Sequence, residues 1–242
     1  MERTEFISEC QRLFALNSLP CDEMQAERLY QLTLRMLEVN QVMNLTAITD
    51  EKTIILRHYV DSLMISRYLP TDARVIDVGC GAGFPTLPLA IFRPDLKITA
   101  LDGTAKRIRY VDETARLLSL TNVTAVAGRA EEYAQKDGYR EGFDVATARA
   151  VAALPMLSEL CLGFVAVGGS MVAMKAQQAE DEISAAKNAI SLCGGAVSKV
   201  VTTELMSNEG ASERRVLALI QKNKPTPQKY PRHFSKISKN PL

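Results

Sequence analysis

Three glycines stand at alternate positions after an apolar run of the chain: Gly79, Gly81 and Gly83. The valines and isoleucine before them favour a β-strand, the glycines favour a tight loop, and the apolar residues from Phe84 onward can start a helix. Because glycine has no Cβ and accepts positive φ, such a loop lets a ligand approach the backbone at the end of the strand. A dinucleotide fingerprint needs glycine where Phe84 stands, so the spacing speaks against NAD or FAD.

A carboxylate closes the next predicted strand, which spans residues 97–102. The Asp102 side chain could accept hydrogen bonds from both hydroxyls of a ribose, or it could only cap the helix expected over residues 104–119. An acidic strand end after a G-x-G-x-G loop resembles the class I S-adenosylmethionine-dependent methyltransferases. Loop and carboxylate together therefore favour S-adenosylmethionine as the cofactor. The expected contacts in this part of the chain are Gly79, Gly81, Gly83 and Asp102.

Two further loops fall at predicted strand ends on the same side of the sheet. Residues 128–131 follow a strand expected over 122–127, and their backbone amides and a side chain could hold an adenine ring, or Glu131 could simply favour a helix start. Arg149 follows a strand expected over 143–148 and could contact substrate or cofactor, or pair with a neighbouring helix. The residues alone leave both alternatives open.

Polar side chains also gather on a helix expected over residues 49–69. His58 and Asp61 are three positions apart on it, and Arg57 and Asp61 are four apart, so an ordinary ion pair along the helix can account for them. The alternative is that this face lines the cleft, with Arg57 and His58 toward the substrate.

Strands and helices alternate around these residues. The pattern predicts helices at 3–16 and 22–40, then strands at 74–79, 97–102, 122–127, 143–148 and 170–175 that alternate with helices at 84–92, 104–119, 130–135, 153–166 and 177–191. Two last strands, at 196–203 and 214–221, should form a hairpin. We expect an α/β, Rossmann-like fold with a mainly parallel sheet, an antiparallel terminal strand and an N-terminal helical cap. The expected division is 1–70 for the cap, 71–221 for the methyltransferase core and 222–242 for a basic tail.

The composition limits the class of protein. With 242 residues and 47% hydrophobic side chains, the chain can bury the core of one α/β domain. The N-terminus lacks the apolar core of a signal peptide, and no apolar run approaches a bilayer span. We expect a cytoplasmic monomer without a membrane partner. The five cysteines and two histidines show no metal-ligand spacing, so we expect free thiols and no metal site.

Charge is distributed unevenly along the chain. All 28 acidic residues precede Arg214, whereas eight of the 29 lysines and arginines lie from that residue onward, together with Tyr230 and Phe234. A solvated tail is the ordinary explanation, but cations interleaved with aromatic rings suit RNA. The expected RNA contacts in this tail are Lys229, Arg232, Lys236 and Lys239.

Five segments spread over nearly the whole chain resemble the glucose-inhibited division protein B family: residues 44–48, 57–63, 77–85, 149–152 and 230–242. Members of that family are bacterial methyltransferases that act on guanine N7 in small-subunit ribosomal RNA. The resemblance implies 16S ribosomal RNA or the small ribosomal subunit as the partner. It also implies cofactor contacts at Gly79, Phe84, Ala130, Glu131 and Arg149. The chain has Thr86, Ser235 and Ile237 where the family usually has two glycines and a proline.

Devices of other nucleic-acid methyltransferases are missing from the sequence. The Asp/Asn-Pro-Pro-aromatic loop of amino-group enzymes would follow the fourth strand, where residues 148–151 read Ala-Arg-Ala-Val, and the Pro-Cys pair of pyrimidine C5 enzymes occurs only at Pro20 and Cys21. Guanine N7 has a free lone pair, so an in-line displacement needs no catalytic residue as an obligatory base. A methyltransferase for a small molecule or protein, and a ribosome-assembly protein that binds RNA without catalysis, are the alternatives.

Overall fold

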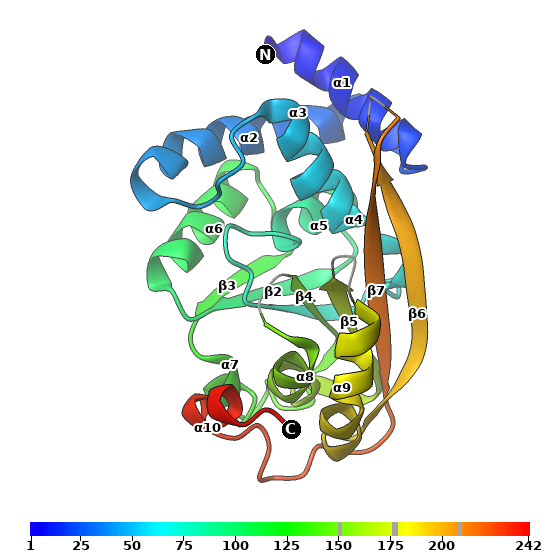
Figure 1. Cartoon of the computed structure of the whole chain (residues 1–242). Helices are drawn as coiled ribbons and strands as arrows, with labels where there is room; N and C mark the ends of the chain where they lie inside the picture. The colour runs from blue at the N-terminus through cyan, green and yellow to red at the C-terminus, as the bar shows by residue number, and fades with distance from the viewer. Residues whose placement is uncertain (150–151, 176–178, 208–209) are drawn as a thin grey trace.

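The computed structural model describes residues 1–149, 152–175, 179–207 and 210–242. Within these residues, a seven-stranded sheet has the strand order β3-β2-β1-β4-β5-β7-β6, with helices on both of its faces (Figure 1). The strand order reverses between β1 and β4. The carboxyl ends of these two strands therefore mark the switch point at which open α/β sheets bind ligands.

The N-terminal helices cover one face of the sheet. They are α1 (Arg3–Leu16), α2 (Glu23–Met43), α3 (Glu51–Ile54), the π-helix η1 (Ile55–Val60), α4 (Asp61–Leu63) and the 3-10 turn η2 (Ser66–Tyr68). α2 begins at a capping box in which Asp22 and Gln25 satisfy each other's backbone amides, and it ends at Asn44 in the left-handed conformation. The helical segment expected over residues 49–69 is confirmed, although its middle is a π turn.

The next elements build the part of the sheet that carries the glycine loop. They are β1 (Arg74–Val78), α5 (Thr86–Phe92), β2 (Lys97–Asp102), α6 (Ala105–Leu117), β3 (Val123–Ala127), α7 (Ala130–Tyr133), β4 (Phe143–Arg149) and α8 (Leu154–Leu162). The four strands are parallel to one another. Their carboxyl ends, and the polar residues placed there, therefore lie at one edge of the sheet.

The remaining elements complete the sheet and form the tail. They are β5 (Val165–Lys175), α9 (Ala179–Leu192), β6 (Gly195–Met206), β7 (Ser212–Lys222) and α10 (Phe234–Lys239). β5 is parallel to β4, whereas β7 runs antiparallel to both β5 and β6. The predicted antiparallel hairpin that ends the sheet is confirmed, with β6 at the edge and β7 between β5 and β6.

Apolar side chains fill both faces of the sheet. One core joins the N-terminal helices, α5 and α6 to strand residues such as Val75, and the other joins α8 and α9 to strand residues such as Ile76. Adjacent residues of a strand point to opposite faces, which is why Val75 and Ile76 belong to different cores. The central strands are covered on both faces, as an α/β sheet requires.

Some predicted boundaries are wrong. The helix predicted over 153–166 ends at Leu162, because Phe164 turns back to donate to Cys161 O and β5 begins at Val165. The tail contains a helix, α10, that was not predicted. The predicted start of the helix over 177–191 lies outside the described residues, as do two residues of the loop between β6 and β7.

Candidate functional site

The glycine loop joins β1 to α5 and has left-handed backbone at Gly79, Gly81 and Gly83, with φ of 76°, 55° and 86°. L side chains rarely adopt such angles. A Cβ at Gly83 would in addition lie 2.6 Å from Leu87 Cδ1. The Gly79 amide donates to Leu101 O at 2.7 Å, which ties the loop to the neighbouring strand. The loop therefore presents backbone to the space in front of β1 and β2.

Asp102 ends β2 beside this loop, and its carboxylate has two backbone partners. Oδ2 accepts from the Gly81 amide at 3.0 Å, and Oδ1 accepts from the Thr104 amide at 2.8 Å. Thr104, and not Asp102, is the N-cap of α6, so the alternative that Asp102 caps this helix is not met; Asp102 accepts only from the amide of the N-cap residue itself. An ionised carboxylate has about four acceptor sites, and Asp102 therefore retains capacity for ribose hydroxyls.

A cavity of about 290 Å³ opens in front of these strand ends. Its lining residues come from the loop, from the ends of β2 and β3, from α8 and from the tail: Val78, Gly79, Leu101, Asp102, Gly103, Thr104, Gly128, Arg129, Ala130, Glu131, Leu160 and Phe234. Glu131 is buried, and its Oε1 lies 3.3 Å from Arg129 Nε. The volume is near the lower end of the roughly 300–1,000 Å³ of ligand pockets. An apolar floor with two carboxylates suits a nucleoside.

Phe84 brings two of the predicted site residues together. The His58 ring stacks on it with centroids 4.5 Å apart, and the Arg149 guanidinium carbon lies 5.3 Å from its centroid. His58 Nε2 also lies 2.9 Å from Thr46 Oγ1. Burial and then the charge of Arg149 lower the pKa of His58 to about 4, so the ring is neutral at physiological pH. His58 is thus fixed as an uncharged, stacked group.

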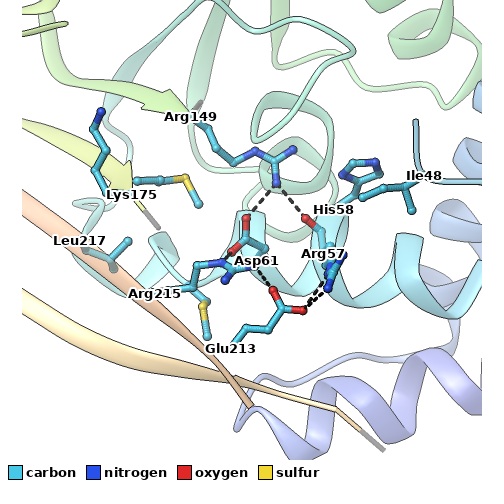
Figure 2. A pocket seen from close by; sticks show the side chains of 11 residues that line it. Ile48, Arg57, His58, Asp61, Arg149, Lys175, Glu213, Arg215 and Leu217 are labelled. Carbon is cyan, nitrogen blue, oxygen red and sulfur yellow. Dashed lines mark hydrogen bonds and ion pairs between the residues drawn. The ribbon is translucent and has the colours of Figure 1, made fainter. Parts of the chain in front are cut away.

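A second cavity, of about 560 Å³, contains the chain of alternating charges shown in Figure 2. Asp61 accepts from Arg149 at 2.9 Å and from Arg215 at 2.7 Å. Arg215 also donates to Glu213 at 2.8 Å, and Glu213 pairs with Arg57 at 2.6 Å. The predicted ion pair between Arg57 and Asp61 is therefore wrong, because both side chains pair with residues that are distant in the sequence.

The larger cavity carries an excess of positive charge. Four of its lining residues are cations and two are anions. Lys175, one of the cations, pairs with Glu182 at 2.7 Å, while Met64, Met174 and Leu217 supply apolar surface. A cationic surface with apolar side chains between the charges suits a ligand that combines phosphate with a flat base.

Sequence reasoning assigned no role to Asp77, which lies below the glycine loop and is 1% exposed. Thr86 Oγ1 donates to its Oδ2 at 2.7 Å, and Thr147 Oγ1 lies 3.4 Å from its Oδ1. Burial raises the pKa of Asp77 to about 6, although both threonines oppose that shift. Thr86 stands where the resembled family usually has glycine, and here it satisfies a buried carboxylate. A charged residue inside an apolar strand was the signal that could have revealed this pair.

The predicted RNA-binding tail is packed against the body of the protein. Arg232 donates to the fully buried Glu159 through Nε at 2.8 Å and Nη2 at 2.7 Å. Lys229, Lys236 and Lys239 are exposed. Arg232 is thus occupied by a structural ion pair, whereas the three lysines are accessible to a polyanion.

Other features of the site are structural. The thiol of Cys80 is buried in the glycine loop, and burial raises its pKa well above the ordinary value, so it is protonated and packs as an apolar group. Among the residues that the structure describes, no cluster of side chains could hold a metal ion. Within the same residues, no helix is both long and apolar enough to span a bilayer.

Comparisons with known proteins give a family and a fold. Residues 25–210 match the sequence model of a family described as rRNA small subunit methyltransferase G. Proteins named ribosomal RNA small subunit methyltransferase G from Leuconostoc citreum and Lactobacillus delbrueckii subsp. bulgaricus are 42% and 39% identical to the chain. The two alignments cover 91% and 98% of this chain, and 92% and 99% of the relatives.

Solved structures share the architecture of the sheet and its helices. A SAM-dependent methyltransferase from Aquifex aeolicus has a TM-score of 0.52 and 18% identity, over 70% of this chain and 93% of that one. The precorrin-6y C5,15-methyltransferase from Geobacter metallireducens has a TM-score of 0.51 and 18% identity, over 68% and 87%. The predicted class I methyltransferase fold is thus confirmed.

Proposed function

The chain belongs to the rRNA small subunit methyltransferase G family, and from this premise we propose that it transfers the methyl group of S-adenosylmethionine to N7 of a guanine in 16S ribosomal RNA. The resemblance noted in the sequence is confirmed at the level of the family. The observation that carries the proposal is the presence, at one edge of the sheet, of a glycine-loop pocket with two carboxylates and of a larger cationic cavity.

The smaller cavity fits the nucleoside part of the cofactor. Asp102 would accept hydrogen bonds from the ribose, and the Ala130 amide and Glu131 would flank the adenine. Gly79, Gly81 and Gly83 would let the rest of the cofactor approach the backbone, beside Phe84 and Arg149.

The larger cavity and the exposed lysines would bind the RNA. Arg57, Arg149 and Arg215 offer guanidinium groups to phosphates at the mouth of the cavity. Their own partners Asp61 and Glu213 fix these side chains, so that the guanidinium groups are held in position before RNA arrives.

The chemistry asks the protein for alignment. When bound, S-adenosylmethionine supplies a methyl group that the N7 lone pair attacks in line, so that the new N–C bond forms as the C–S bond breaks. N7 carries no proton, and no side chain has to remove one. The buried rings of His58 and Phe84 and the partly exposed Arg149 form a stacked group that can fix the relative positions of the two cavities, and proximity of this kind supplies much of a catalytic rate.

Transfer of a radiolabelled methyl group tests the proposal. The purified protein should label 16S ribosomal RNA or small-subunit particles, and mass spectrometry of RNA from cells with and without the protein should locate one N7-methylguanine that depends on it. Asp102→Ala is the control, and it should weaken cofactor binding by about 1–3 kcal/mol because it removes acceptors from a closed site.

The two alternatives give different results in the same assay. Label in protein or in small molecules, and none in RNA, would show that the substrate is a protein or a small molecule instead of RNA. Cofactor binding without turnover on any RNA would instead support an RNA-binding protein of ribosome assembly. Label on RNA at an atom other than guanine N7 would retain the enzyme class and reject the target atom.

A further inference from the structure

The tail helix α10 places an aromatic ring at the smaller cavity. Ile237 is fully buried, whereas Phe234, three positions earlier, is half-buried and lines the cavity with Asp102 and Glu131. α10 packs on α8, on the side of the sheet opposite the N-terminal helices (Figure 1). Ile237 thus anchors the helix, and part of the Phe234 ring is left available to a ligand.

Arg129 connects this ring to the rest of the cavity. Its guanidinium carbon lies 4.6 Å from the centroid of Phe234, and its Nε lies 3.3 Å from Glu131 Oε1. Its Cδ lies 3.6 Å from the position that a Cβ at Gly103 would take. Arg129 and Phe234 therefore form a continuous stacked surface from the loop after β2 to the tail.

Buried contacts hold the tail in this position. Besides its pair with Glu159, the Arg232 guanidinium donates to Asn240 O at 3.0 Å, so that it holds the chain just before and just after α10. Gln135 Nε2 donates to Tyr230 O at 3.0 Å, and Tyr230 is itself buried. A wall that recognises a ligand needs such support, because misplacement of the ring would lose the contact.

We propose that Phe234 is a cofactor-binding residue, whose ring, backed by the Arg129 guanidinium, forms the outer wall of the cavity and stacks on the nucleoside end of S-adenosylmethionine. This inference rests on the proposed function, because it takes the cavity at Asp102 as the cofactor site. Aromatic rings and guanidinium planes stack on nucleobases, and Leu101 and Leu160 supply apolar surface elsewhere in the same cavity. The tail then completes the cofactor site in addition to presenting cations to RNA.

Calorimetric titration of the full chain tests this role with two ligands. S-adenosylhomocysteine contains the nucleoside and the amino acid, whereas 5′-methylthioadenosine lacks the amino acid. Phe234→Ala should weaken the binding of both ligands by the same factor, roughly 5- to 100-fold. Phe234→Tyr keeps the ring, so its affinities should stay within about 2-fold of those of wild type. Ser238→Ala, at an exposed position of the same helix, is the matched control and should bind like wild type.

The outcomes separate this inference from the proposed function. Wild-type affinity in Phe234→Ala would overturn the inference about Phe234. A loss of affinity for S-adenosylhomocysteine alone would also overturn it, because it would place the ring at the amino-acid end of the cofactor. An equal loss in Phe234→Tyr would assign the effect to disturbance of the tail and would also overturn it. Melting temperatures without ligand identify misfolding, and Phe234→Leu, which keeps apolar packing, replaces the alanine variant if that one misfolds. A wild-type protein that binds neither ligand contradicts the proposed function itself.

Discussion

Burial sets the ionisation of the residue that could have served as a base. The pKa of His58 is lowered to about 4 by burial and by Arg149, so the ring stays neutral from weakly acidic to weakly alkaline pH. Because guanine N7 carries no proton, we expect His58→Gln to keep single-turnover methyl transfer within about 10-fold of wild type, below the roughly 10²–10⁴-fold of an obligatory base.

The pH profile of the same rate provides the control for His58. The wild-type rate should be nearly flat over this range, and the variant should have the same profile. A limb that titrates as a histidine in the wild type and disappears in the variant, together with a loss in the general-base range, would mean that the target atom has to be deprotonated.

Asp77 carries the opposite kind of shift. Burial raises its pKa to about 6 from an ordinary value of 3.8, so the folded protein keeps a proton that the unfolded chain has released between these values. The contribution of Asp77 to the free energy of unfolding therefore falls as pH rises through this window. Between about pH 4 and pH 7, the free energy of unfolding of Asp77→Asn should rise by up to roughly 3 kcal/mol relative to that of wild type, as measured by urea denaturation.

Asp144 offers a matched control on the neighbouring strand. Partial burial alone would raise the pKa of Asp144, but hydrogen bonds from Arg74 keep this pKa below the ordinary value of 3.8. The stability of Asp144→Asn relative to wild type should therefore fall as pH rises from below the pKa of Asp144 in the folded protein to above 3.8. This is the reverse of the trend at Asp77. A difference between Asp77→Asn and wild type that does not change with pH would mean that Asp77 is ionised in the fold.

The sequence could predict residues whose role follows from local spacing. The loop glycines and Asp102 fall where expected, because three positive φ angles and a strand-end carboxylate follow from neighbouring residues. Arg57 and Asp61 were paired wrongly because hydrogen bonds in the π-helix η1 join residues five apart, so residues four apart no longer align as in an α-helix. Their real partners lie on β7 and β4, and no local pattern indicates those contacts.

At the level of elements, a buried ion pair is one of the contacts that hold α10 in place. Glu159 on α8 is fully buried, and Arg232 is the residue that neutralises it. Removing one partner of a buried pair strands the other charge, so Arg232→Met should lower the free energy of unfolding by about 3–5 kcal/mol. Chemical denaturation measures this loss. The double variant Arg232→Met, Glu159→Met should recover much of it, and equal losses in the single and double variants would show that the pair itself is not the cause.

We propose that the exposed lysines of the tail contact RNA phosphates. We expect the triple variant Lys229→Gln, Lys236→Gln, Lys239→Gln to reduce the slope of log affinity against log salt by roughly 2, since each contact with single-stranded RNA releases about 0.7 counterion. Cofactor affinity should not change. Filter binding over a series of salt concentrations measures the slope, and a slope equal to that of wild type would leave these lysines as solvated surface.

Helices and strands with regular apolar periodicity were predictable to within a few residues, and β2 matches its predicted range. The exceptions have physical causes. The apolar residues that follow Gly163 extend the apolar pattern of α8, so the sequence predicts a longer helix. In the structure the chain reverses at Gly163 and Phe164 and continues as β5. α10 has only six residues, and its formation depends on the contact of Ile237 with the body and on the pair of Arg232, which the tail composition does not reveal.

On the scale of the whole molecule, the N-terminal helices and the sheet share a core. Phe14 of α1 stacks on Phe92 of α5 at 5.2 Å, and Asn17 exchanges hydrogen bonds with the backbone of Met206 at 2.8 and 3.1 Å. We therefore expect the predicted units 1–70 and 71–221 to unfold in one cooperative transition, with equal calorimetric and van't Hoff enthalpies. Two separated transitions by calorimetry would show that the cap is an independent unit.

The position of β7 has a consequence for the order in which the protein can be completed during synthesis. β6 leaves the ribosome before β7, yet its place in the sheet exists only after β7 has paired with β5. Until residues 212–222 are available, the nascent chain presents the unpaired edge of β5, a surface to which other chains can add. Translation that stops short of β7 would therefore yield a sheet with an open, aggregation-prone edge, and the sheet can be completed only after residues 212–222 have been synthesised.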